Sequence, residues 1–347
     1  MKRCKKLIGL LLIASMSVSP FSGLQAMAKA EKSSTAPSIQ EQFAERRTLY
    51  DNMSTLTGIP WYVLAAVDQY ERTISIANPK KRPLRDGLIS IHIPNNKWAG
   101  ELNPDEIDTE PKSIAFFDGF GKDGNGDGKA DPKDDTDLLY SMASYLQEYG
   151  TAPDDTNIAL WEFYKNARSV ERIEQFARLY SHFNTLDLHK HTFVMPLRAD
   201  YSYRSTWGAA RSYGGYRIHE GTDLFASYGV PVRSVCYGII EVMGWNRYGG
   251  WRVGIRDLNN VYHYYAHLSG FNKKEVKEGD IVVPGQVIGW VGSSGYGKPG
   301  TSGKFPPHLH YGLYRDNGFT EWSFDPYPYL RRWEREERIS LSKKKKK

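Results

Sequence analysis

The chain has 347 residues, and its 46 Lys and Arg against 40 Asp and Glu give a formal net charge of +6. This length predicts about two domains, since ~150 residues per domain is a usual value. Residues 1–28 hold four of the basic residues and residues 343–347 are five lysines, so the rest carries 37 basic against 40 acidic residues. The basic charge lies at the two ends, which argues against an extended nucleic-acid-binding surface.

Residues 1–28 have the pattern of an export signal. A basic start is followed by an apolar run from Leu7 to Val18, and Ala26-Met27-Ala28 offers small residues for cleavage. The apolar run is shorter than the ~20 residues that cross a bilayer, so we expect an exported chain without a stable membrane span. A loosely ordered polar leader is expected over residues 29–42. Past the signal the chain has one cysteine, Cys236, and therefore no disulfide framework.

Residues 43–188 are expected to form a mostly helical domain. Pro60 stands where a first helical turn would begin, and apolar residues follow it at helical spacing. Three further amphipathic helices are predicted over Asp137–Tyr149, Asn157–Phe163 and Ser169–Phe183.

An acidic, glycine-rich loop from Asp123 to Asp134 follows the spacing of a calcium loop. Oxygen ligands recur at alternate positions, and glycine stands at position six, as a hard cation requires. Position twelve is aspartate instead of the usual glutamate, so an acidic turn without a metal is the other interpretation. The expected Ca²⁺ ligands are Asp123, Asn125, Asp127, Lys129 through its backbone, Asp131 and Asp134.

This loop and the helix after it resemble the calcium-loop region of lytic transglycosylases, which have a lysozyme-like fold. Residues 58–71 resemble the helix that ends in their catalytic glutamate, and the resemblance implies that Glu71 is the general acid for cleaving a glycan strand. Arg72-Thr73-Ile74 departs from that family's pattern, and its glycine-rich groove motif is not recognisable around residues 97–103. The alternative hypothesis is a domain that holds a glycan or a partner without cutting.

Beyond about His189 the composition changes to short β-branched runs separated by Gly, Pro and Asn. This pattern predicts a mainly antiparallel β domain over residues 189–334, followed by a basic tail over residues 335–347. Cys236 lies in the first run and is expected to be a buried strand residue, not a nucleophile. Strands are predicted over Val230–Val242, Trp251–Arg256, Val261–His267, Ile281–Val291 and His308–Tyr314.

Imidazole and carboxylate groups recur in this second domain. Residues two apart in a strand point to the same face, so His308 and His310 are expected to project side by side. By the same rule His263 and His267 share one face if their segment is extended. Two histidines and one carboxylate are typical of a catalytic zinc site, which keeps a position open for water.

The order H-x-x-x-D, then Y-A-H-L, then H-L-H resembles the lysostaphin/LytM-type zinc endopeptidases, which cut peptides in bacterial peptidoglycan. The resemblance covers roughly residues 193–329 and implies that His219, Asp223 and His310 bind one Zn²⁺. It also implies that His267 and His308 orient or deprotonate the water and stabilise the oxyanion. Gly295–Pro307, rich in glycine and proline, is expected to wall the substrate groove.

The two halves together look like the LytH-type L-alanyl–D-glutamate peptidases of endospore-forming bacilli, which trim stem peptides during spore cortex maturation. This resemblance is the only ground for naming the bond. The prediction is therefore an exported zinc peptidoglycan hydrolase of the cell wall, extracellular space or spore envelope. Two hypotheses remain beside it: a non-catalytic wall-binding scaffold, and a glycan-cleaving enzyme acting through the first domain. An H-E-x-x-H zincin helix is disfavoured, because the fifth position is Asp223 and Gly221 disrupts a helix.

Overall fold

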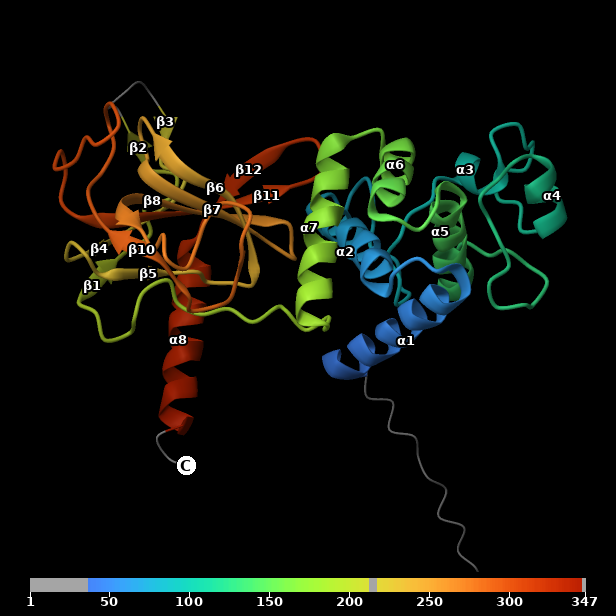
Figure 1. Ribbon diagram of the computed structural model, residues 1–347, viewed down its shortest axis with the longest axis horizontal. Coiled ribbons are helices and arrows are strands. Elements are labelled where there is room, and N and C mark those ends of the chain that lie inside the picture. The colour runs from blue at the N-terminus through green and yellow to red at the C-terminus, as the bar shows by residue number, and fades with distance from the viewer. Residues whose placement is uncertain (1–36, 212–216, 345–347) are drawn as a thin grey trace, which may run out of the picture. The chain divides into compact units, whose positions relative to one another are not determined.

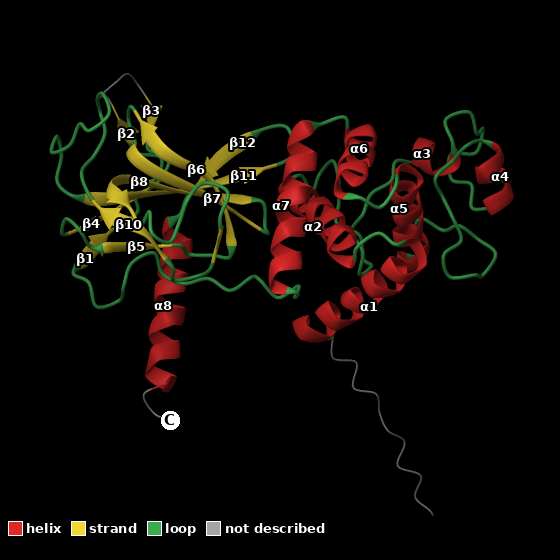
Figure 2. Ribbon diagram, in the orientation of Figure 1, coloured by secondary structure: helices red, strands yellow, loops and turns green. Residues whose placement is uncertain are grey.

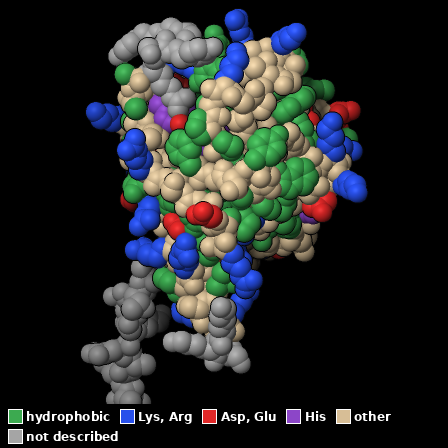
Figure 3. Space-filling view, turned by 90° about the vertical axis from the view of Figure 1, so that its left-hand side faces the viewer, with side chains coloured by type: hydrophobic (Ala, Val, Ile, Leu, Met, Phe, Trp, Pro, Cys, Tyr) green, Lys and Arg blue, Asp and Glu red, His purple; other side chains and the backbone are tan. Residues whose placement is uncertain are grey.

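The computed structural model describes residues 37–211 and 217–344. The expected export signal (residues 1–28) and most of the expected leader lie outside these ranges. Residues 38–347 form one compact unit (Figure 1). Across the described ranges, no helix has both the length and the apolar character needed to cross a bilayer. On the face drawn in Figure 3, Lys and Arg side chains are scattered among other kinds instead of forming one patch.

The first half of the described chain is helical, and the second half is a sheet followed by one long helix (Figure 2). The helices are α1 (Ile39–Thr57), α2 (Trp61–Ala77), α3 (Asn95–Ala99), α4 (Pro111–Phe116), α5 (Asp135–Tyr149), α6 (Pro153–Tyr164), α7 (Ala167–Phe183) and α8 (Tyr327–Lys344). The helices that were predicted from the spacing of apolar residues coincide with α2, α5, α6 and α7.

The start of α1 is fixed by a capping box. The Ser38 hydroxyl accepts a hydrogen bond from the Glu41 amide, and the Glu41 carboxylate accepts one from the Ser38 amide at 2.6 Å. These bonds satisfy amides that a helix start leaves without a partner. The helix therefore includes Ile39–Gln42, which the sequence analysis assigned to a loosely ordered leader.

The strands form one antiparallel sheet in the order β1-β4-β11-β8-β7-β6-β9, with β12 beside β11 and β10 joining β5 to β8; β2 and β3 pair separately. The strands are β1 (Tyr201–Tyr203), β2 (Ala210–Arg211), β3 (Arg217–Ile218), β4 (Thr222–Ala226), β5 (Pro231–Arg233), β6 (Gly238–Asn246), β7 (Gly250–Asp257), β8 (Val261–Phe271), β9 (Ile281–Val282), β10 (Val287–Val291), β11 (His308–Asp316) and β12 (Glu321–Phe324). The expected antiparallel sheet and the helical region before it are confirmed.

Two of the predicted strands are each broken in two. The run Val230–Val242 is interrupted by residues 234–237, where the Ser234 hydroxyl donates to the Cys236 carbonyl at 2.9 Å. The run Ile281–Val291 is interrupted by a turn with Gly285 at φ 91°. Local side-chain bonds and a left-handed turn interrupt the pairing, although the β-branched composition continues through both breaks. Cys236 is buried, as expected, but it lies in the break between β5 and β6 and not in a strand.

The expected basic tail is helical through Lys344, because α8 packs one side against the sheet. Leu330 and Trp333 are fully buried there, and the Glu334 carboxylate accepts a hydrogen bond from the Tyr201 hydroxyl at 2.7 Å. Glu337 pairs with Arg233 at 3.0 Å. Packing thus extends the helix into the segment that was predicted as a basic tail.

Buried apolar side chains form two clusters, one in the helical half and one in the sheet. Except for Ile239 and Leu258, the first cluster ends at Leu188, and the second begins at Phe193. The division falls where the composition changes. The domain limits of 43–188 and 189–334 stay a proposal, since residues 38–347 form a single compact unit.

Candidate metal centre

Two neighbouring strands carry the central residues of the site. β4 and β11 pair antiparallel with Asp223 directly opposite His310, so both side chains lie on the same face of the sheet. β8 pairs with β11 on its other side. His219 precedes β4 and is buried with 2% of its surface exposed. The sheet therefore brings together residues that are 91 positions apart in the chain.

His219, Asp223 and His310 are in mutual contact. Asp223 Oδ1 lies 3.0 Å from His219 Nε2 and 3.0 Å from His310 Nδ1, and the two nitrogens are 2.9 Å apart. All three possible ligand atoms lie within 4.8 Å of one another. The structure thus gathers the three residues that the sequence resemblance named as zinc ligands.

The hydrogen bond at the far side of His219 determines what this side chain can bind. His219 Nδ1 lies 2.8 Å from the Thr206 carbonyl oxygen, which can only accept, so Nδ1 carries the proton. In the neutral ring Nε2 then has a lone pair, and it faces the acceptor oxygen of Asp223. His219 Nε2 and Asp223 Oδ1 are then two acceptors in contact, and they repel each other unless a positive charge lies between them or on one of them. A bound cation would supply that charge.

The charge state of Asp223 fits the same role. Burial alone would raise the pKa of this carboxyl, but its contacts with His219 and His310 outweigh burial and hold the pKa below its usual range. Asp223 is therefore an anion at neutral pH. A carboxylate and two imidazoles form a donor set that suits Zn²⁺.

His267 and His308 lie beside this group. Each donates from Nδ1 to a carbonyl, His267 to Ser294 and His308 to Pro306, both at 2.8 Å, which leaves Nε2 as an acceptor. The two rings are 4.9 Å apart, and His308 Nε2 is 3.8 Å from Asp223 Oδ1. Burial, together with His310 and His308, lowers the pKa of His267 to about 3. The ring of His267 is therefore neutral at pH 7.

The backbone at His267 breaks the strand alternation. Its φ is 64°, and the register between β7 and β8 shifts next to it, between Trp251 and Val253. Tyr264 and Ala266 line the site together with His267, whereas His263 and Tyr265 face the other side of the sheet. The expectation that His263 and His267 share a face is therefore wrong, because one left-handed residue reverses the parity of the strand.

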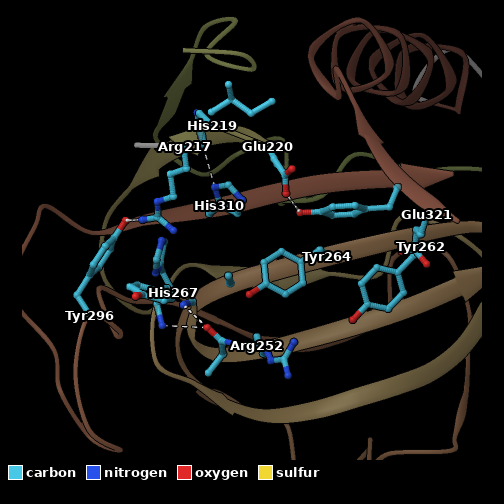
Figure 4. A pocket seen from close by; sticks show the side chains of 16 residues that line it. Arg217, His219, Glu220, Arg252, Tyr262, Tyr264, His267, Tyr296, His310 and Glu321 are labelled. Atoms are coloured by element: carbon cyan, nitrogen blue, oxygen red, sulfur yellow. Dashed lines mark hydrogen bonds between the residues drawn. The ribbon is translucent and has the colours of Figure 1, made fainter. Parts of the chain in front are cut away.

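A cavity of about 470 Å³ opens at this group (Figure 4). Arg217 donates to the Tyr296 hydroxyl at 2.9 Å, and the ring of Phe305 lies 4.7 Å from that of His267. The segment Gly295–Pro307 therefore contributes a wall of the site, as expected. No motif pointed to several further lining residues, Arg252, Tyr262, Tyr264, Tyr314 and Glu321, and Glu220 entered only through the disfavoured zincin pattern.

Gly221 is required by the ring of His310. A Cβ atom at Gly221 would lie 2.6 Å from His310 Cε1 and 2.6 Å from the Tyr311 carbonyl oxygen. From the sequence alone, this glycine indicated only that the segment is not a helix. Its structural task is to leave space for an imidazole of the site.

Glu71, the expected glycan acid, is fully buried. Its carboxylate accepts a hydrogen bond from the Tyr164 hydroxyl at 2.6 Å and pairs with Arg82. Burial raises its pKa to about 7, although Arg82 acts in the opposite direction. An acid of this pKa could donate a proton, but enclosed in this way it has no surface to offer a glycan.

The expected calcium loop is held by its own backbone. Asp123 accepts from the Gly126 and Gly128 amides, and Asp134 caps α5. Asp137, which the sequence analysis did not select, is fully buried and accepts from amides of the loop, those of Gly124, Asn125 and Asp131. Asn125, Asp127 and Asp131 likewise accept from backbone amides, at 2.8–2.9 Å, and the Lys129 amide donates to Asp127. In the ranges that the structure describes, these carboxylates are not among the groups close enough to share an ion, so calcium is not supported.

Comparisons with known proteins agree with this geometry. A model described as peptidase family M23 matches residues 217–325. The chain is 58% identical over 294 residues to the L-Ala–D-Glu endopeptidase of Bacillus subtilis (strain 168), covering 85% of this chain and 90% of that protein. A match of this length must include the helical half as well as the sheet.

Two shorter matches cover 38% of the chain each. Identity is 36% over 138 residues to the glycyl-glycine endopeptidase ALE-1 of Staphylococcus capitis, which is 38% of this chain and 35% of that protein. The solved catalytic domain of lysostaphin from Staphylococcus simulans matches with 33% identity and a TM-score of 0.30, over 38% of this chain and 92% of that domain.

Proposed function

The chain belongs to peptidase family M23, and from this premise we propose that it hydrolyses the L-alanyl–D-glutamate bond in peptidoglycan stem peptides with one bound Zn²⁺. Similarity to the Bacillus subtilis endopeptidase over 85% of the chain supports the choice of bond. The observation that carries the proposal is the convergence of His219, Asp223 and His310 on one point at the edge of a cavity.

We assign the metal to His219 Nε2, Asp223 Oδ1 and His310 Nδ1. The contact between the lone pair of His219 and the Asp223 carboxylate supports this assignment, since it calls for a positive charge. Zinc bound by such a set lowers the pKa of a water molecule towards ~7 and polarises the carbonyl that is to be attacked.

We assign proton transfer to His267 and His308. Each has its Nδ1 proton tied to a backbone carbonyl, so Nε2 can accept a proton from the attacking water. A ring protonated in this way can donate to the oxyanion or return the proton to the leaving amine. Phe305 packs against both rings, at 4.7 Å and 5.0 Å, and restricts their rotation.

The cavity chemistry suits a stem peptide. These peptides carry free carboxylates, and Arg217 and Arg252 bring positive charge to the cavity wall. Tyr262, Tyr264 and Tyr314 offer apolar ring faces with hydroxyl ends. We therefore expect the peptide to lie across these residues, with its scissile bond next to His267 and His308.

We further propose that residues 1–28 export the chain to the cell wall, the extracellular space or the spore envelope. The lysozyme-like fold of residues 43–188 also stays a prediction. The burial of Glu71 favours a helical half that holds a glycan strand without cutting it. A groove of about 910 Å³, lined by Phe117, Phe120, Tyr145 and Tyr149 among others, offers aromatic faces for this.

Digestion of purified peptidoglycan, with mass identification of the products, tests the proposal. We expect new free amino groups on D-glutamate and intact glycan strands. Anhydro-sugar ends would instead implicate the helical half as a glycan-cleaving enzyme. An unchanged polymer in the presence of Zn²⁺ would leave the non-catalytic scaffold as the explanation.

A further inference from the structure

A second group of two histidines and one aspartate lies away from the peptidase site. Asp257 Oδ2 is 3.3 Å from His263 Nε2 and 3.7 Å from His191 Nε2. All three possible ligand atoms lie within 4.8 Å of one another. Strand alternation places His263 on the face of β8 opposite to Tyr264, which lines the peptidase site. The two groups are therefore on opposite faces of the same sheet.

Three separate segments meet at this group. His191 belongs to the segment before β1 and stacks on Trp333 of α8, with ring centroids 4.9 Å apart and an interplanar angle of 4°. Asp257 ends β7, and His263 lies in β8 after the turn that joins the two strands. An ion held here would tie the segment leading into the sheet to a β-hairpin, underneath the C-terminal helix.

One ring nitrogen of His263 is buried and faces the Asp257 carboxylate. The residue is 1% exposed, and its Nε2 lies 3.3 Å from Asp257 Oδ2. Its other nitrogen, Nδ1, lies 2.7 Å from the Tyr311 hydroxyl, which fixes the ring orientation. A metal ligand is commonly held in this way, with one ring nitrogen anchored and the other directed at the ion.

Asp257 is prepared for the same role. Its Oδ1 accepts from the Asn259 and Val261 amides at 2.8 and 2.9 Å, and its Oδ2 faces the two histidines while accepting from the Asn259 side chain at 3.1 Å. Hydrogen bonds from these three donors favour the charged form of the carboxyl. An anionic carboxylate beside imidazoles is the donor state that binding of a divalent metal requires.

The group lines a cavity of about 250 Å³, which leaves room for an ion and a further ligand. Arg315 and Arg332 also line this cavity, and their charges oppose a cation. Each guanidinium lies over an aromatic ring, Arg315 over Phe324 at 5.1 Å and Arg332 over Tyr329 at 5.3 Å. We therefore expect weaker binding than at the peptidase site, with an anion or water completing the coordination.

We propose that His191, Asp257 and His263 form a second site for a divalent transition-metal ion such as Zn²⁺, with a structural role separate from the peptidase site. Two imidazoles with one carboxylate suit zinc and its neighbours better than calcium or magnesium, which prefer oxygen ligands. With one cysteine in the described chain and no disulfide there, such an ion would add a cross-link between distant segments.

The test is the zinc content per full-length chain after equilibrium dialysis against micromolar Zn²⁺. We expect two ions in the wild type, one in His263→Ala, one in His310→Ala, and close to none in the double variant. His182→Ala replaces an exposed histidine outside both groups and should retain two. A wild-type content of one ion that His263→Ala leaves unchanged would overturn the proposal, as would loss of both ions in His310→Ala.

Two further measurements distinguish loss of the metal ligand from misfolding of His263→Ala. His191 is more exposed, with 15% of its side chain accessible, and His191→Ala should also lose one ion. Zn²⁺ should raise the Tm of His310→Ala but not that of the double variant, since binding to the native state alone stabilises it. The second site does not depend on the proposed function, because peptidase activity is read separately from ion content.

Discussion

The carbonyl groups behind the histidines determine the chemistry at the scale of single residues. Thr206, Ser294 and Pro306 each accept the Nδ1 proton of one histidine, so His219, His267 and His308 all have a lone pair at Nε2. Only His219 has that nitrogen 3.0 Å from the Asp223 carboxylate; His308 Nε2 is 3.8 Å away. Because of this difference in distance, we expect His219 to bind the metal and His308 to act as a base.

We therefore expect different results from two alanine substitutions. His310→Ala should remove the zinc of the peptidase site together with activity. His308→Ala should lower kcat about 10²–10⁴-fold, the usual contribution of a general acid–base group, while the zinc content stays unchanged. Kinetics with a stem-peptide substrate and metal analysis of the same samples provide the measurement. A normal rate in His308→Ala would show that its assigned role is wrong.

Gly221→Ala tests the space needed by His310. The new methyl group would lie 2.6 Å from the imidazole, so the ring must move and weaken its contact with Asp223. We expect a fall in zinc affinity and activity, with a loss of stability of about 1–3 kcal/mol from overpacking. Gly270→Ala is the matched control, because no atom lies within 4 Å of its new methyl group. Equal behaviour of the two variants would contradict this explanation.

At the scale of elements, Glu71 joins α2 to α6 through Tyr164 and to the segment after α2 through Arg82. Its pKa of about 7 lies above the ordinary 4.5. Between these pH values the folded chain holds a proton that the unfolded chain releases. The contribution of this group to stability is therefore full below pH 4.5 and falls as the pH rises through 7.

We expect Glu71→Gln to remove the part of the pH dependence of the unfolding free energy that comes from this carboxyl. That part amounts to at most about 3 kcal/mol. Urea unfolding of both proteins at pH 5 and pH 8 gives the comparison. Peptidase activity should be unchanged in the variant. A large loss of glycan-cleaving activity on the same substitution would restore Glu71 as a catalytic acid.

On the scale of the whole molecule, a buried ion network joins the helical half to the sheet. Arg172 of α7 pairs with Glu241 of β6 at 2.7 Å, and Arg256 of β7 pairs with the same carboxylate at 3.1 Å. Gln69 of α2 also donates to the Leu258 carbonyl at 2.8 Å. The helices are therefore anchored to strands that lead into the peptidase site.

Arg172→Ala should destabilise the chain by about 3 kcal/mol, because a buried pair loses one partner. This loss of stability lies at the low end of the range for broken buried ion pairs, since Arg256 still contacts Glu241. Lys165→Ala removes an exposed pair with Glu162 and should cost less than about 1 kcal/mol. Thermal unfolding of both variants makes the comparison. Similar Tm values would show that the network contributes little.

The sequence by itself determined the family, the enzyme class and four of the eight described helices. Apolar spacing predicted α5, α6 and α7 because the helical period is local. The spacing H-x-H placed His308 and His310 on one face because strand alternation is local as well. The similarity to a known endopeptidase confirmed the resemblance drawn from three short motifs.

Only the tertiary structure decided which of these groups meet. A single positive φ at His267 separated it from His263, and burial enclosed Glu71. The grouping of His191, Asp257 and His263 depends on a stacking contact with a helix more than a hundred residues away. Periodicity describes the faces of one element, whereas enclosure and metal-binding geometry arise from packing between elements that are distant in the chain.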